Sequence, residues 1–344
     1  MKRSHIKNAL YLCLCIPAFL FSSCEKDDDK IIVLPPIDTT MVYQSVNIGA
    51  NGDTMVFVDL STGATTFAPA KIYDLAFEAS ATGQYIYLNT FKYMFAYRTQ
   101  FTDILQADSS GLSWSCDGDT WEGDSTAFGK NIDAAGNVIN KVMILDLGKY
   151  SHTGADRYRK FQVTEITADH YLIKYCKLDN SDYHEFTVTK DAAYSLTYFS
   201  FENGGNMVNV APPKTQWDFV FTRYVHTYWD QPIAYRYYFV NGSMLNIWAG
   251  TTSTMIKKDS LPNYIPFADL TGADVNNYPY TSVANQMGFD WKYYDFNANH
   301  YYVHPDQYYI ISDSETKYFK LQYTDFYTTQ GEGHHPTYQY QRIY

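Results

Sequence analysis

The stretch YFKLQYTDF at residues 318–326 closely matches an earlier one, YRKFQVTEI at residues 158–166. Apolar and polar side chains alternate along both stretches, which is the period-two pattern of a half-buried β-strand. The two stretches begin 160 residues apart in a chain of 344 residues. A unit built from strands is therefore predicted to occur twice.

Two further pairs of stretches keep the same order along the chain. FVDLSTG at 57–63 corresponds to YFSFENG at 198–204, and IYDLAFE at 72–78 corresponds to QWDFVFT at 216–222. We call them the first and second marker pairs. Their offsets are 141 and 144 residues, and periods this long indicate duplicated domains, not a solenoid of short repeats.

Composition and turn signals indicate the class of each unit. Tyr, Phe and β-branched residues are typical of strands, and Gly and Asn recur where hairpin turns need positive φ, as in ENGG and VNGS. Long helical patterns are nearly absent. We predict an all-β protein of two tandem domains, residues 41–183 and 184–344, each made of antiparallel twisted sheets.

The N-terminus has the pattern of a secretory signal. Three basic residues lie within residues 1–7, and an apolar run follows at 9–21 that is shorter than the ~20 residues of a membrane-spanning helix. The run ends in SSC, similar to the lipobox of bacterial lipoproteins, so Cys24 is the expected lipidation site. We predict a signal peptide at 1–23 and an acidic, proline-containing tether at 24–40. The acidic stretch is similar to the surface-export signals of Bacteroidetes lipoproteins, which predicts a lipid-anchored protein exposed on an outer membrane.

Charge and motifs narrow the function classes. Loss of residues 1–23 changes the formal net charge from −11 to −14, and without a basic cluster nucleic acid is not an expected partner. The catalytic motifs HExxH and GxSxG and the P-loop and Rossmann fingerprints are absent from the sequence, so no enzyme activity is predicted. The acidic string at 116–124 lacks the spacing of an EF-hand and is interpreted as a solvated loop. Cys116 and Cys176 are expected to be buried free thiols, with a disulfide as the alternative.

Three segments resemble the HmuY family of haem-binding surface lipoproteins. They are LTYFSFENGGNMVNV at 196–210, WDFVFTRY at 217–224 and YYIISDSETKYFKLQYTDFY at 308–327, and the first half repeats the plan more faintly. The resemblance implies an all-β fold of twisted sheets and two such domains in tandem. It also implies a surface binding protein for haem or a related iron source, which would be delivered to a TonB-dependent receptor.

The resemblance also directs attention to axial ligands, which are His or Met in such proteins. A family histidine follows a tryptophan by five positions; here the counterpart of that tryptophan is Trp291, and Phe296 stands where the histidine would be. The remaining candidates are Met255, Met287, His300 and His304, each with a purely structural role as the alternative. Tyrosines of the same region are expected to line the haem pocket, namely Tyr293, Tyr294, Tyr301 and Tyr302. No metal other than haem iron is expected.

Two other functions stay open at this point. Aromatic loops also stack on sugars, so a glycan-binding or adhesive surface lipoprotein is the main alternative. A structural module that has lost its ligand is the other, because of Phe296.

Overall fold

The computed structural model describes residues 39–344, which are nearly all β-structure. The strands are β1 (Val42–Ser45), β2 (Thr54–Val58), β3 (Thr65–Pro69), β4 (Leu75–Glu78), β5 (Ile86–Leu88), β6 (Phe95–Arg98), β7 (Val142–Asp146), β8 (Tyr158–Ile166), β9 (His170–Cys176), β10 (His184–Thr189), β11 (Leu196–Ser200), β12 (Asn206–Val208), β13 (Phe219–Thr227), β14 (Tyr237–Leu245), β15 (Thr252–Lys257), β16 (Lys292–Asp295), β17 (His300–Val303), β18 (Gln307–Ser312), β19 (Tyr318–Asp325) and β20 (Thr337–Arg342). The helical segments are α1 (Ile233–Arg236) and the 3-10 turns η1 (Thr90–Lys92), η2 (Gly123–Ser125), η3 (Gly154–Arg157), η4 (Glu202–Gly204), η5 (Ile247–Ala249), η6 (Gly272–Asn277) and η7 (Ala284–Gln286).

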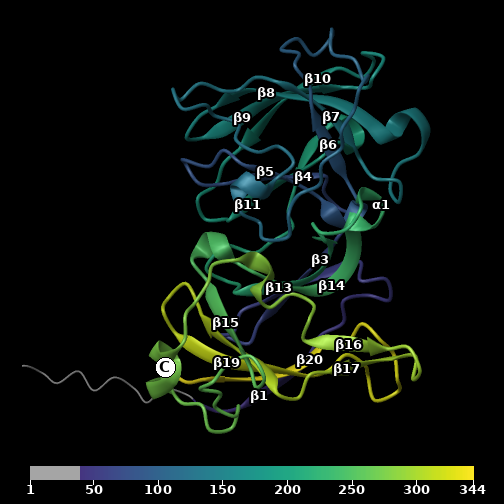
Figure 1. The fold of residues 1–344 in the computed structure, drawn as a ribbon. Coiled ribbons are helices and arrows are strands. Elements are labelled where there is room, and N and C mark those ends of the chain that lie inside the picture. The colour runs from purple at the N-terminus through teal and green to yellow at the C-terminus, as the bar shows by residue number, and fades with distance from the viewer. Residues whose placement is uncertain (1–38) are drawn as a thin grey trace, which may run out of the picture. The chain divides into compact units, whose positions relative to one another are not determined.

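The strands form four larger sheets and one separate hairpin (Figure 1). The five-stranded sheets have the orders β10-β9-β8-β7-β6 and β1-β20-β19-β18-β15, and the four-stranded sheets have the orders β12-β11-β4-β5 and β14-β13-β2-β3. Strands β16 and β17 pair only with each other among the described residues. Neighbouring strands are antiparallel throughout, from β1–β20 to β8–β9. The predicted all-β class is confirmed.

The two similar stretches at residues 158–166 and 318–326 take equivalent places in the fold. The first is strand β8 and the second contains strand β19, and each is the central strand of a five-stranded sheet. Both carry an irregularity of register at the same point, between Val163 and Glu165 in β8 and between Tyr323 and Asp325 in β19. An unpaired residue at such a point increases the local twist, so the two strands share a bend as well as a sequence.

The two aspartates of the second marker pair reach across to the first marker pair. Asp74 accepts a hydrogen bond from the Phe201 amide at 2.8 Å, and Asp218 accepts one from the Leu60 amide at 2.7 Å. Both carboxylates are buried, where an unpaired backbone N–H would be costly. Each aspartate therefore ties its own half of the chain to the opposite half.

The strand ladders also cross the boundary predicted at 183/184. Strand β2 pairs with β13, and β11 pairs with β4; β1 pairs with β20, and β10 pairs with β9. The opening strands of each predicted domain thus complete sheets of the other. The domain ranges 41–183 and 184–344 stay a prediction, and the signal peptide and Cys24 lie outside the described residues.

Aromatic side chains fill the cores of these sheets. The ring of Trp291 stacks on Tyr323 with centroids 4.2 Å apart, inside a buried cluster that also contains Phe219 and Tyr338. Aromatic pairs of this kind contribute about 0.5–1.5 kcal/mol beyond the area they bury. Cys116 and Cys176 are buried free thiols, as predicted. None of the helices in residues 39–344 is long and apolar enough to cross a membrane.

Candidate functional site

The hairpin β16–β17 carries most of the predicted site residues. In its register Tyr293 lies opposite Tyr302, and Asp295 lies opposite His300. Successive side chains of a strand point to opposite faces, which places His300, Tyr302 and His304 on one face together with Tyr293. Ring distances agree: Tyr302 lies 4.9 Å from His300 and 5.9 Å from Tyr293, and Tyr293 lies 5.0 Å from His304. We call these four residues the histidine face of the hairpin.

The two imidazoles of the histidine face are available for bonding. The His300 ring stacks flat on Tyr327, with centroids 4.1 Å apart and planes 13° apart. Within residues 39–344 neither imidazole makes a hydrogen bond. Partial burial and the nearby Lys257 ammonium lower the pKa of His304, so its ring is neutral at neutral pH, the form that binds metal ions.

The spacing of these histidines limits what they bind together. His304 lies four positions after His300, which at ~3.3 Å per residue of extended chain puts their Cα atoms about 13 Å apart. Two imidazoles on opposite sides of one iron could span such a distance, but the rings of Tyr302 and Tyr293 lie between these two imidazoles. As it stands, the histidine face therefore offers one imidazole to any one iron.

The other two predicted tyrosines point to the opposite face of the hairpin. The Tyr301 ring lies 5.3 Å from Phe326 and packs against the buried core, and the Tyr294 ring lies 4.9 Å from Tyr301. The Tyr301 amide donates to the Tyr327 hydroxyl at 2.9 Å. Phe296, at the tip of the hairpin, is 87% exposed.

The two predicted methionines lie at the core and not beside the histidines. Met287 is 1% exposed within the cluster that contains Trp291, and its carbonyl accepts a hydrogen bond from Tyr309 at 3.0 Å. Met255 lies opposite Tyr309 in the β15–β18 ladder and packs against the same cluster. Either thioether would reach an iron only if this core opened.

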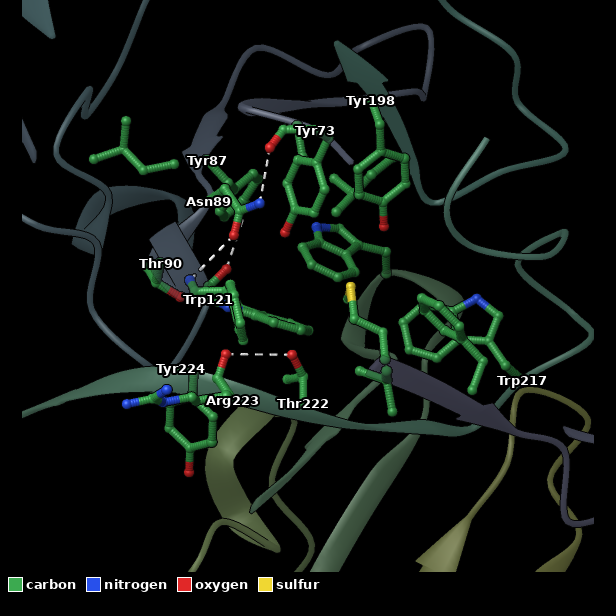
Figure 2. A pocket seen from close by; sticks show the side chains of 18 residues that line it. Tyr73, Tyr87, Asn89, Thr90, Trp121, Tyr198, Trp217, Thr222, Arg223 and Tyr224 are labelled. Atoms are coloured by element: carbon green, nitrogen blue, oxygen red, sulfur yellow. Dashed lines mark hydrogen bonds between the residues drawn. The ribbon is translucent and has the colours of Figure 1, made fainter. Parts of the chain in front are cut away.

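A second site, which sequence reasoning missed, is an aromatic pocket between the two four-stranded sheets (Figure 2). Its walls include Phe57 from β2 and Tyr198 from β11, together with Tyr73 and Trp217, which precede β4 and β13. The enclosed free space is about 30 Å³, enough for one or two water molecules. The four wall residues occupy matching places in the two marker pairs, because aromatic residues recur at the same positions in both halves. This recurrence is the feature of the sequence that could have predicted the pocket.

Trp121 covers one side of this pocket. It stacks on Trp248 with ring centroids 5.1 Å apart, and its carbonyl accepts a hydrogen bond from the Tyr87 hydroxyl at 3.3 Å. Its backbone has φ of +55°, a left-handed conformation that costs a residue other than glycine roughly 1–2 kcal/mol. Strain of this kind is often found at ligand sites.

The acidic string at 116–124, which carries Trp121, is not the solvated loop expected from sequence. Asp117 is 2% exposed and accepts hydrogen bonds from the Leu88 and Ala127 amides at 2.6 and 2.8 Å. Asp119 is 8% exposed and lies 2.5 Å from His226 Nδ1. That prediction is wrong for both aspartates, because nearby backbone amides and an imidazole replace water around them. Within residues 39–344, no group of three or more His, Cys, Asp or Glu side chains is arranged to hold a metal ion.

No family model matches the chain, and no curated protein does. Three solved structures are similar to it. Apo PinO from Porphyromonas gingivitis is 9% identical, and the match covers 89% of this chain and 98% of that chain with a TM-score of 0.29. A protein described as HmuY-like and heme-binding, from Bacteroides vulgatus, is 10% identical, with coverage of 90% and 96% and a TM-score of 0.24. The apo HmuY analog of Tannerella forsythia is 11% identical, with coverage of 90% and 100% and a TM-score of 0.24. Two of the three bear the name of the family whose motifs the sequence resembles.

Proposed function

We propose that this protein binds haem, or a related iron chelate, on the histidine face of the β16–β17 hairpin. The observation that supports the proposal is the pair of imidazoles free of hydrogen bonds, flanked by Tyr293 and Tyr302 on one exposed face. Haem is a flat, largely apolar ring with a metal at its centre. Tyrosine rings offer apolar surface to its face or edge, and a neutral imidazole is a common axial ligand.

His300 is the better placed of the two candidate ligands. Its flat stack on Tyr327 fixes the plane of the imidazole, and a ring held in one orientation loses less freedom when it binds metal. Because one imidazole of this face serves each iron, the second axial position falls to a group outside the face.

The proposed location is the surface of an outer membrane, with the protein held there by a lipid anchor. Lipidation at Cys24 would hold the described domain to a membrane through several acyl chains, because each buried methylene contributes about 0.8 kcal/mol. The acidic residues after Cys24 resemble surface-export signals. Capture at the surface of an outer membrane and delivery to a TonB-dependent receptor follow from the sequence resemblance. The proposed role is binding, not catalysis.

A hemin titration of the full chain tests the proposal. We expect a saturable shift of the haem absorbance band, in both oxidised and reduced states. The H300A variant should weaken binding at least tenfold, because an iron–imidazole bond is lost. H184A is the matched control, since His184 is also partly exposed but lies on β10 beside Asp182. A titration without a saturable shift would refute haem binding. Loss of haem binding in M287A but not in H300A would identify the buried methionine, and not His300, as the iron ligand.

An exposed aromatic group near α1 favours glycan binding as the second candidate. Trp229, Tyr235 and Tyr238 are 68%, 73% and 59% exposed, and aromatic faces stack on the apolar faces of sugar rings. A glycan array separates the two functions. Binding to a neutral glycan that W229A abolishes, together with a featureless hemin titration, would favour this candidate.

A further inference from the structure

The aromatic pocket between the four-stranded sheets has hydroxyl groups that the protein leaves unsatisfied. The rings of Tyr73 and Tyr198 stand together, with centroids 4.9 Å apart, and their hydroxyls point into the pocket (Figure 2). Tyr198 is only 6% exposed. Neither hydroxyl makes a hydrogen bond within residues 39–344, and neither oxygen is among the fully buried side-chain atoms there that lack a partner. The two groups therefore face the free space of the pocket, where a ligand or trapped water can meet them.

The walls of the pocket favour an uncharged ligand with a flat ring. Indole and phenyl groups dominate the lining, and they stack best on flat apolar surfaces. Arg223, the charged residue of the lining, directs its guanidinium away from the pocket (Figure 2), over the ring of Phe239 at 4.1 Å. Burial and nearby carboxylates raise the pKa of Tyr73, so its phenol keeps its proton and donates.

Entry to the pocket requires movement of Trp121. The present free space of about 30 Å³ holds no six-membered ring. The segment that carries Trp121 is fastened at separate points: Asp119 bonds to His226 at 2.5 Å, and the Thr120 carbonyl accepts the Ala284 amide at 3.0 Å. Between these fastenings and η2, Trp121 itself is the strained residue. Rotation of its indole off Trp248 would expose a second flat face.

We propose that this pocket is a gated binding site for a small, neutral, planar ring compound that carries a hydrogen-bond acceptor. The ring takes the place of Trp121 on Trp248, and the phenols of Tyr73 and Tyr198 donate to the acceptor. This site is separate from the histidine face and takes a smaller ligand than haem.

Benzamide is a suitable probe, because it is flat and neutral and carries a carbonyl acceptor. Cyclohexanecarboxamide is the matched control compound, since it has the same amide on a puckered ring. Calorimetric titration of the full chain should show benzamide binding and no binding of the control compound. The W121G variant should bind benzamide at least tenfold more tightly, because a closed lid lowers apparent affinity by the fraction of open molecules. Glycine adopts positive φ without strain, so W121G is expected to fold.

The Y198F variant tests the polar half of the proposal. It keeps the ring and removes one donor, and should weaken benzamide binding by two- to tenfold, the value of one hydrogen bond. Y43F is the control, because Tyr43 is 72% exposed on β1 and outside the pocket. The proposal is overturned if W121G fails to bind benzamide, or if it binds both amides equally. Unchanged benzamide affinity in Y198F would show that the Tyr198 phenol does not donate to the ligand, and would overturn the polar half of the proposal.

Discussion

At the scale of single residues, two buried carboxylates make stability depend on pH. Burial raises the pKa of Asp117 and of Asp218 to about 7, against an ordinary value of 3.8. A folded-state pKa above the unfolded one means that the folded chain holds the proton more tightly. The stabilisation is complete below pH 3.8 and is lost as the pH rises through 7. Neither residue could be recognised from sequence, because aspartate in an acidic string or a strand start gives no sign of the amides that will surround it.

D218N should remove one of these two contributions. An asparagine keeps an oxygen to accept the Leu60 amide and never ionises, so it avoids the cost of a buried charge. The mutation should change the free energy of unfolding more favourably at pH 8 than at pH 4. The difference between these two changes should be on the order of 2–4 kcal/mol. Urea unfolding at both pH values measures this difference. D269N is the control at an exposed carboxylate, and an identical pH dependence of D218N and wild type would contradict the assignment.

At the scale of elements, strand type was predictable and strand partners were not. Alternation of side chains marked β8 and β19 as strands because period two is a local property. The same pattern does not predict which strands pair with each other. Strand β2 could pair with any strand of suitable register, and it pairs with β13, more than 150 residues away. For the β16–β17 hairpin, alternation is enough to separate the histidine face from Tyr294 and Tyr301. The aromatic-rich sequence alone suggested one pocket for all four tyrosines.

The hairpin is held to the core by few polar contacts, and one of them can be removed without changing shape. Y327F keeps the ring on which His300 stacks and removes the hydroxyl that accepts the Tyr301 amide. A neutral hydrogen bond contributes a net 0.5–1.5 kcal/mol or so, so the Tyr301 amide should exchange with solvent roughly two- to tenfold faster. Amide hydrogen exchange measures this rate. Y302F is the control on the exposed face, and unaltered exchange in Y327F would mean that the core contacts of Tyr301 alone hold the hairpin.

At the scale of the whole molecule, the two halves of the chain are interlocked. Each half contributes its opening strands to sheets that the other half completes, through β2–β13 and β4–β11. The sequence repeat predicted two similar halves in order along the chain. It left their mutual exchange of strands unseen, because three matched segments specify similarity and not partnership. Asp74 and Asp218 each add a buried link across the halves, since each accepts a hydrogen bond from an amide of the opposite half.

Separating the halves tests how far they depend on each other. A chain cut at 183/184 leaves β11 without β4 and β13 without β2, and unpaired edges beside exposed core favour aggregation over folding. We expect neither half alone to show the dispersed amide NMR spectrum of a folded protein. Co-expressed halves should instead form a 1:1 complex that elutes with the intact chain in size-exclusion chromatography.

Halves that fold separately and remain apart would instead favour two independent tandem domains, with the ladders across the boundary adding little to the stability of either. The D74A/D218A double variant refines the result: if the two carboxylates help to hold the halves together, the 1:1 complex should weaken by about tenfold or more, since each change leaves a buried backbone amide without its acceptor, at a cost of about 1–3 kcal/mol.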